Sequence, residues 1–396
     1  MKGELPLTGI RVVDFGRFIA GPYCGMLLAD MGADVIRVDR RQGSEDRYIA
    51  PITKGGEGGG FLSLNRNKRS LTLDTGKPES AEIIRRLLRK ADVVIANLPN
   101  QILKKMGLDY ESLRNLKPDI ILARISTFAP DGPYADRVGF DAVAQAMCGA
   151  MTLTGTGEEP LRDIVPFMDY GTALHTAFGI MVALFHRTQM GEGQLVDGSL
   201  LATGITFMQN LLAEEHVTGV ARRASGNRSF YAAPSDTYRA RDGWIMVSVV
   251  GNEMFERWAK LVGRPRFTQD PRFATDQLRA DNHEPITSAM SDWTRTRSMQ
   301  EAVTELEKAR IPAGPVQQLN QVLADPQVQA RRLLKFLNYP GAAKPVPLAE
   351  TAVQLSSTPG SIRHRAPVLG EHTNEILLDL GYSMDEINEL RAQKVV

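Results

Sequence analysis

The chain has 396 residues, 43% of them hydrophobic, which is enough for about two domains with cores of their own. Its 47 Lys and Arg residues balance 46 Asp and Glu residues, so nucleic acid or an anionic membrane is not expected as its main partner. The two cysteines, Cys24 and Cys148, lack CxxC neighbours, which argues against a disulfide framework and a structural zinc site. The sequence shows no signal peptide and no apolar run long enough to span a bilayer, so we expect a cytoplasmic protein without a membrane partner.

Short apolar runs alternate with amphipathic ones in the N-terminal third of the chain. Pro22 in the first turn and Gly32 as a stop delimit one helix. Strands are predicted at 10–15, 33–39, 92–97 and 118–126, and helices at 22–32 and 80–91. This order predicts an α/β fold with a parallel sheet covered by helices.

The middle of the chain predicts a long apolar helix at 170–188 and a strand that continues into a helix at 193–215. The polar segment 218–229 is interpreted as a linker. Asp242 and Gly243 then supply the turn of a hairpin. Two capping boxes, Ser298 with Glu301 and Ser383 with Glu386, mark helix starts.

These patterns divide the chain into three parts. The large domain is expected to cover 1–220 and a small domain 225–325, with 330–396 as a C-terminal segment.

Cations gather in three segments that end or flank strands of the predicted sheet. They are 39–47 with three arginines, 64–70 with three cations and two asparagines, and 97–107 with Lys104 and Lys105. One such segment is usually a solvated loop, but three together suggest a cradle for a multiply phosphorylated ligand. The first strand–helix turn, 14–22, lacks the GxGxxG pattern of standard dinucleotide sites.

Asp169 stands at the start of the apolar helix and allows two interpretations. Aspartate is a preferred N-cap, which a substitution would remove at a cost of about 1 kcal/mol. A carboxylate with an ordinary pKa near 3.9 is also ionised at pH 7, so it could attack an activated acyl group without a general base. The two roles can coexist. The six histidines form no metal spacing and GxSxG is absent, so zinc and serine-hydrolase chemistry are not supported.

Read in order, the segments resemble the class III CoA-transferases. The matching stretches include "VVDFGRFIAGPYCGMLLADMGADVIRVD", "FLSLNRNKRSLTLD", "DGPYADRVGFDAVAQAMCGAM" and "MDYGTALHTAFGIMVALFHRTQMGEGQLVDGSL". The resemblance implies a Rossmann-like large domain, to which the C-terminal segment returns, a smaller α+β domain, and a homodimer of interlocked chains. It implies acyl-CoA and a carboxylic acid as substrates, with no tightly bound cofactor.

The same resemblance assigns the site residues. Asp169 matches the nucleophile, which would form an aspartyl anhydride and then an aspartyl-CoA thioester. For the mechanism that this implies, we expect backbone N–H groups near Gly251 and Asn252, or near Gly139 and Phe140, to stabilise the oxyanion. Residues matching CoA contacts of the family are Phe18, Ile19, Ala20, Arg40, Leu64, Asn65, Arg66, Asn67, Asn97, Leu98, Lys105 and Arg137.

Departures from the family pattern leave alternatives open. "NLPNQ" lacks the Arg-Pro-Gly that often follows its asparagine, and "VVGNEM" replaces the glycine-rich loop of oxalate-specific members. The related α-methylacyl-CoA racemases carry a histidine base where this chain has Phe140, which cannot exchange a proton. A racemase or other acyl-CoA isomerase, and a non-catalytic CoA-binding protein, remain as alternatives. Arg223, Asn227 and Tyr231 are either linker residues or a site for a second carboxylate.

Overall fold

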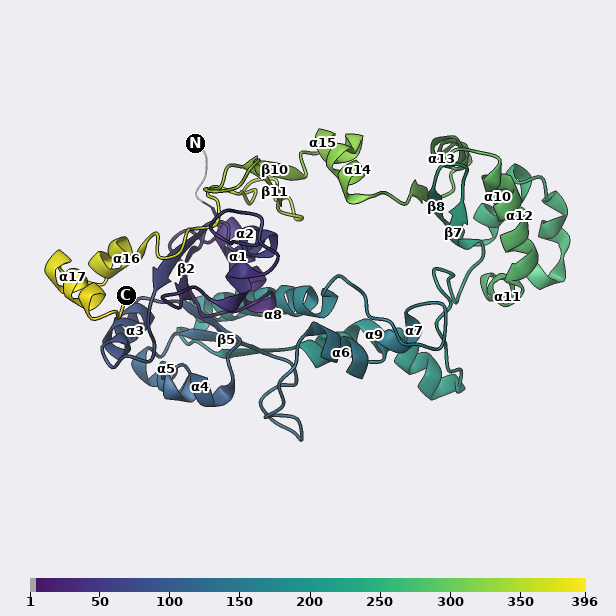
Figure 1. Ribbon diagram of the computed structural model, residues 1–396. Coiled ribbons are helices and arrows are strands. Elements are labelled where there is room, and N and C mark those ends of the chain that lie inside the picture. The colour runs from purple at the N-terminus through teal and green to yellow at the C-terminus, as the bar shows by residue number, and fades with distance from the viewer. Residues whose placement is uncertain (1–4) are drawn as a thin grey trace. The chain divides into compact units, whose positions relative to one another are not determined.

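The computed structural model describes residues 5–396, which form two compact units (Figure 1). Unit 1 comprises residues up to Cys148, Ile164–Met208 and Gln327–Val396. Unit 2 comprises Gly149–Asp163 and Gln209–Pro326. The chain therefore leaves unit 1 twice, after Cys148 and after Met208, and the second of these points lies within helix α9 (Leu200–Thr218).

Unit 1 is built on a six-stranded sheet in the order β3-β2-β1-β4-β5-β6, with every pairing parallel. The strands are β1 (Arg11–Asp14), β2 (Asp34–Asp39), β3 (Lys68–Thr72), β4 (Val93–Ala96), β5 (Ile121–Ser126) and β6 (Leu195–Ser199). This is the strand order of doubly wound nucleotide-binding folds, in which the order reverses between β1 and β4. The expected α/β class with a parallel sheet is confirmed.

The four strands expected in the N-terminal third are all present, but β3 was not predicted. The cation-rich segment 64–70 was expected to lie in or beside a loop of the sheet domain. Lys68 and Ser70 nevertheless lie buried in the sheet, because carboxylates inside the protein bind both side chains. Tertiary ion pairing has overridden the local polar signal.

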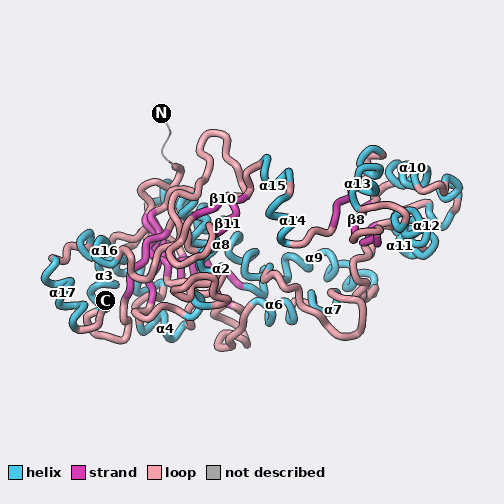
Figure 2. The backbone as a smooth tube through the Cα atoms, turned by 45° about the horizontal axis from the view of Figure 1, so that its top comes forward, coloured by secondary structure: helices cyan, strands magenta, loops and turns pink. Residues whose placement is uncertain are grey.

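Helices cover both faces of the sheet (Figure 2). Apolar side chains of β1, β2, β4 and β5 pack with helices α3, α4, α5, α16 and α17 in one core. On the other face, α1 and α8 contact each other, and α8 contacts β5 and β6. The helices of unit 1 are α1 (Ala20–Asp30), α2 (Gly59–Leu64), α3 (Ser80–Arg89), α4 (Asn100–Lys105), α5 (Tyr110–Leu116), α6 (Asp141–Met147), α8 (Phe167–Met190), α16 (Thr373–Asp379) and α17 (Met384–Ala392), with the 3-10 helix η1 at Glu45–Tyr48.

The C-terminal segment of unit 1 begins within α15 (Pro326–Ala330) and forms the hairpin β10 (Leu334–Leu337) and β11 (Val346–Ala349). Helices α16 and α17 then lie beside the N-terminal part of the chain, yellow beside purple and blue in Figure 1. Backbone N–H groups of β3 are bonded by His372 and Thr373. The Ser383–Glu386 capping box is confirmed at the start of α17.

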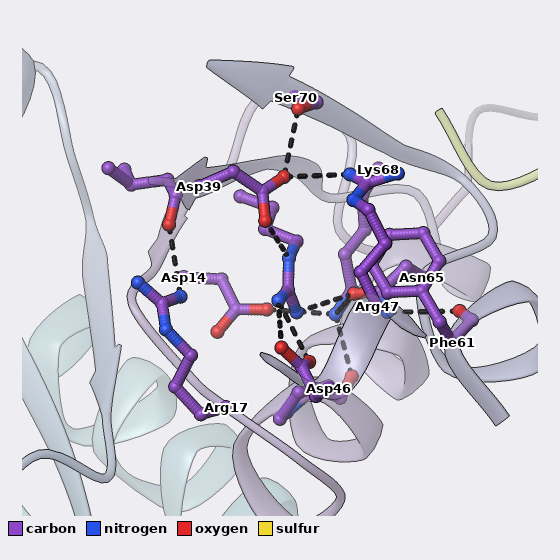
Figure 3. A network of polar contacts seen from close by, with 12 residues as sticks. Asp14, Arg17, Asp39, Asp46, Arg47, Phe61, Asn65, Lys68 and Ser70 are labelled. Carbon is purple, nitrogen blue, oxygen red and sulfur yellow. Dashed lines mark hydrogen bonds and ion pairs between the residues drawn. The ribbon is translucent and has the colours of Figure 1, made fainter. Parts of the chain in front are cut away.

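Charged side chains from β1, β2, β3 and η1 are buried together beside the sheet (Figure 3). We call Asp14, Arg37, Asp39, Asp46, Arg47 and Lys68 the buried ion network. Arg37 binds Asp39 and Asp46, Arg47 binds Asp39, and Lys68 binds Asp14, all at 2.8–2.9 Å. Asn65 joins the two halves, because its Oδ1 accepts hydrogen bonds from both Arg37 and Lys68. Three carboxylates thus neutralise three cations out of contact with water.

Unit 2 has a three-stranded antiparallel sheet in the order β7-β8-β9. The predicted hairpin is confirmed as β7 and β8, and the Ser298–Glu301 capping box opens α13. Its core joins the sheet to α10, α12 and α13 through Trp258, Phe255 and Met290. The elements are α7 (Ala150–Leu153), β7 (Ser235–Arg239), β8 (Trp244–Ser248), α10 (Asn252–Leu261), η2 (Pro265–Gln269), η3 (Pro271–Phe273), α11 (Asp276–Asp281), α12 (His283–Arg295), α13 (Met299–Lys308), β9 (Ala313–Pro315) and α14 (Leu319–Ala324). Within residues 5–396, no helix combines the length and apolar character that crossing a membrane requires.

Candidate active site

A cavity of about 680 Å³ opens at the carboxyl ends of β1, β4 and β5 in unit 1. It spans the point where the strand order reverses, which is where ligands bind in open α/β sheets. We call it the Asp169 cavity. Its lining includes Arg17, Phe18, Ala20, Arg40, Glu45, Asn97, Leu98, Gln101, Arg124, Thr127, Asp136, Arg137, Gly139, Phe140, Asp169 and Leu200.

The turn between β1 and α1 forms one wall of this cavity. The side-chain amide of Asn97, just after β4, bonds both main-chain groups of Arg17, accepting from N–H and donating to C=O at 2.8 Å each. Phe18, the next residue, has φ at +61°, a conformation that non-glycine residues seldom adopt. The Asn97 clamp holds the turn in place, so the strained Phe18 backbone is fixed from outside.

The start of α8 corrects the N-cap interpretation of Asp169. The helix begins at Phe167, three residues before the predicted start, and Asp169 is already inside its first turn. Asp141, in the first turn of α6, supplies the cap, because its Oδ1 accepts the N–H groups of Met168 at 2.8 Å and Asp169 at 3.2 Å. Asp141 Oδ2 accepts a hydrogen bond from Gln145. The acid that orients the helix end is thus distinct from the acid that lines the cavity.

The carboxylate of Asp169 accepts no hydrogen bond from residues 5–396. Burial, and secondarily the negative charge of Asp141, raise the pKa of Asp169 to about 7. This differs from the expectation of a fully ionised carboxylate at pH 7, because a group with a pKa of about 7 is still partly protonated there. A desolvated carboxylate facing a cavity, with its lone pairs unengaged, is available to react.

Several cations accompany it. Arg17 donates to the carbonyls of Gly16 and Val38, and burial together with the charge of Arg37 lowers the pKa of Arg17. Arg137 lies over the ring of Tyr134 at 4.0 Å and makes no ion pair among the described residues. Arg40 is exposed and pairs with Glu45. Arg17 and Arg137 thus offer guanidinium charge to an anionic ligand.

The structure brings together only part of the predicted CoA set. Phe18, Ala20, Arg40, Asn97, Leu98 and Arg137 line the Asp169 cavity together with Asp169. The remaining predicted residues, Ile19, Leu64, Asn65, Arg66, Asn67 and Lys105, do not line it.

Side chains of the 64–67 segment have partners inside the protein. Arg66 forms an ion pair with Asp30, and Asn67 bonds the same carboxylate and the C-terminal segment. Asn65 belongs with the buried ion network, and Leu64 is buried. The one cation of this segment, Arg66, is thus already engaged by a carboxylate of the same chain, and its contact with CoA stays a prediction.

The expected oxyanion donors differ between the two places. The N–H of Gly251 is occupied by both carboxylate oxygens of Asp276, at 2.9 and 3.0 Å. The N–H groups of Gly139 and Phe140 have no acceptor within residues 5–396, and both residues line the Asp169 cavity. Within residues 5–396 the N–H of Asn252 also has no acceptor, so the first place keeps one free donor and the second place two.

Two functional candidates were missed from the sequence. Arg17 stands beside the noted residues 18–20, and its strand-end position was a usable signal. Asp141 adjoins Phe140 in "GFD", but it lies 27 residues before Met168, so no local capping rule connects them.

Comparison with known proteins identifies the family. The profile of CoA-transferase family III matches residues 7–373. The succinyl-CoA–D-citramalate CoA-transferase of Chloroflexus aurantiacus is 33% identical over 99% of this chain and 98% of its own. The succinate–glutarate CoA-transferase of Agrobacterium fabrum is 34% identical over 95% and 96%. A CaiB/BaiF family protein from Brucella suis, of known crystal structure, is 34% identical with a TM-score of 0.85, covering 96% of this chain and all of that one.

These matches run the length of the chain and agree with the cavity at the sheet's switch point. Because the chain is similar to CoA-transferases over almost its whole length, a transferase is favoured over a racemase and over a non-catalytic CoA-binding protein. The chain belongs to the family III CoA-transferases and moves CoA between an acyl-CoA and a carboxylic acid.

Proposed function

We propose that Asp169 is the nucleophile of this CoA transfer and carries the acyl group as an anhydride. The observation that supports it most is an unengaged, desolvated carboxylate at the cavity wall. Its raised pKa makes the ionised form more nucleophilic than an ordinary carboxylate, although a smaller fraction of the group is ionised at and below about pH 7.

The reaction proceeds by four exchanges at carbonyl carbons. An Asp169 oxygen attacks the thioester, the C–S bond breaks, and CoA thiolate leaves behind an acyl-aspartyl anhydride. The thiolate attacks the aspartyl carbonyl, expelling the donor acid and giving aspartyl-CoA. The acceptor carboxylate then displaces the thiolate, and the thiolate attacks the acceptor carbonyl to release the new acyl-CoA and free Asp169. Each step converts one activated acyl group, a thioester or an anhydride, into another, so the exchange needs no ATP.

The surrounding residues support these steps. The N–H groups of Gly139 and Phe140, which meet no acceptor in the described part of the chain, are suited to stabilise an oxyanion. Arg17 and Arg137 are suited to the phosphates of CoA, so the substrate would be held by the chain itself rather than by a resident cofactor.

Hydroxylamine trapping tests the nucleophile. Incubation with acyl-CoA and hydroxylamine, followed by peptide mass spectrometry, is expected to give a hydroxamate at Asp169. Asp136 lines the same cavity but is exposed, and Asp136→Asn should leave the modification in place. An active enzyme without hydroxamate at Asp169 would exclude the covalent route.

We propose a dicarboxylyl-CoA, such as succinyl-CoA, as donor. Both relatives described above have names that specify succinyl-CoA or succinate. In unit 2, Tyr231 donates to Glu214 and Asn227 donates to Thr237, whereas exposed Arg223 makes no ion pair among residues 5–396. Arg223 is therefore the candidate for a second carboxylate. A panel of acyl-CoAs with Arg223→Gln should show a KM increase confined to dicarboxylate substrates.

We further propose that the protein is a homodimer in which a second copy covers α8. Leu174, Phe178, Val182 and Phe185 follow one another at helical spacing and are 48–72% exposed. A contiguous apolar surface of this kind marks an association site. Sedimentation should show a two-chain particle that Phe178→Lys dissociates. Phe336→Lys, at an exposed phenylalanine of β10, is the matched control.

A further inference from the structure

Two phenylalanine rings from separate loops meet at the Asp169 cavity. The ring of Phe18 approaches that of Phe140 edge to face, with centroids 5.2 Å apart and planes at 81°. Both residues line the same cavity as Asp169. Phe140 is 61% exposed, so burial of its own surface does not explain its place at the cavity.

Each ring is held by a bonded support. Phe18 follows Arg17, whose main chain Asn97 clamps on both sides, and this fixes the unusual φ of +61°. Phe140 precedes Asp141, whose carboxylate accepts the N–H of Asp169 at 3.2 Å. One covalent step and one hydrogen bond therefore connect Phe140 to the backbone of Asp169. Backbone strain spent on presenting an apolar ring to a reactive carboxylate calls for a functional reason.

We infer that the Phe18–Phe140 pair is a shield that keeps water from the acyl-aspartyl anhydride. This inference rests on the nucleophilic role proposed for Asp169. An anhydride in water is open to attack at its acyl carbonyl: the water oxygen forms a C–O bond, the bond to the Asp169 oxygen breaks, and a proton is released. The products are the free acid, free CoA and unmodified Asp169. A transferase must exclude this loss until the thiolate has reacted, and paired rings do so without offering a proton acceptor.

The test is the ratio of acyl-CoA hydrolysis to CoA transfer, measured with succinyl-CoA and a dicarboxylic acid acceptor. Free thiol release without acceptor gives hydrolysis, and chromatography of the acyl-CoA products gives transfer. Phe140→Ala and Phe18→Ala should each raise the ratio by roughly tenfold or more. Phe140→Leu, which keeps a branched apolar side chain at this position, should retain most of the protection. Phe336→Ala, an exposed phenylalanine outside the cavity, should leave the ratio unchanged.

Three outcomes would overturn the shield. The first is an unchanged ratio in both alanine variants, with hydroxamate still formed at Asp169. The second is an equal hydrolysis-to-transfer ratio in Phe140→Leu and Phe140→Ala, because apolar bulk at position 140 would then not protect the anhydride. The third is hydrolysis that persists in Phe140→Ala combined with Asp169→Asn, since water would then attack the thioester directly. Failure of the nucleophile itself is distinguished by the wild-type enzyme giving no hydroxamate at Asp169.

Discussion

Asp169→Asn should stabilise the folded protein at pH 8 and have much less effect at pH 5. In the native state the pKa of Asp169 is about 7, against 3.8 for an unperturbed aspartate. The folded protein therefore retains a proton that the unfolded chain has already lost between those values. Because the unfolded state binds fewer protons there, wild-type stability falls as pH rises from about 4 to about 7. Asparagine does not titrate, so the variant escapes this loss.

The magnitude follows from the shift. A difference of about 3 pKa units corresponds to about 4 kcal/mol in total, at about 1.4 kcal/mol per unit. Roughly 2–3 kcal/mol of this falls between pH 5 and pH 8, because the native group is still largely protonated at pH 5 and largely ionised at pH 8. For a unit of this size, that difference moves the melting temperature by roughly 5–10 °C.

Calorimetric melting of wild type and variant at pH 5 and pH 8, at one protein concentration, measures the effect on the transition of unit 1. Asp136→Asn controls for loss of a cavity carboxylate that is exposed. A stability difference between Asp169→Asn and wild type that is the same at both pH values would refute the raised pKa.

The remaining predictions concern the supports of the site. If Asp169 must be ionised to react, activity should rise with pH to half its maximum near pH 7. Asp141→Asn keeps an oxygen for the α8 N–H groups but removes a charge, so this midpoint should move down, by less than half of the Asp169 shift because burial is the larger cause. Asp141→Ala should also lose about 1 kcal/mol as a cap, measured by urea unfolding. Lys68→Met leaves the carboxylate of Asp14 buried and unpaired and should cost about 3–5 kcal/mol in the same assay. Asn97→Ala should raise the KM for acyl-CoA and leave Tm almost unchanged, because the clamp holds a wall of the cavity. A KM equal to that of the wild type would argue against this role.

The sequence predicted the parts of the molecule whose causes are local. Alternating apolar runs located β1, β2, β4 and β5, and both capping boxes lie where their Ser and Glu residues indicate. The role and the pKa of Asp169 could not be predicted from neighbouring residues. The cap of α8 is Asp141 in α6, and the pKa of Asp169 depends on its burial in the fold. The segment 64–70 failed for the same reason, since distant carboxylates turn its cations inward. Sequence patterns therefore failed where a residue's environment depends on partners that are distant in the chain.

The buried ion network has a consequence for how such a protein can change over generations. Any single neutral replacement among its six charges upsets the balance of three cations and three carboxylates in a dry interior, and only replacement of one charge of each sign together restores it. Single substitutions at these six positions should therefore rarely be tolerated. We therefore expect changes of acyl substrate to come from replacements on exposed loops and in unit 2, while the six charged residues of the network stay the same.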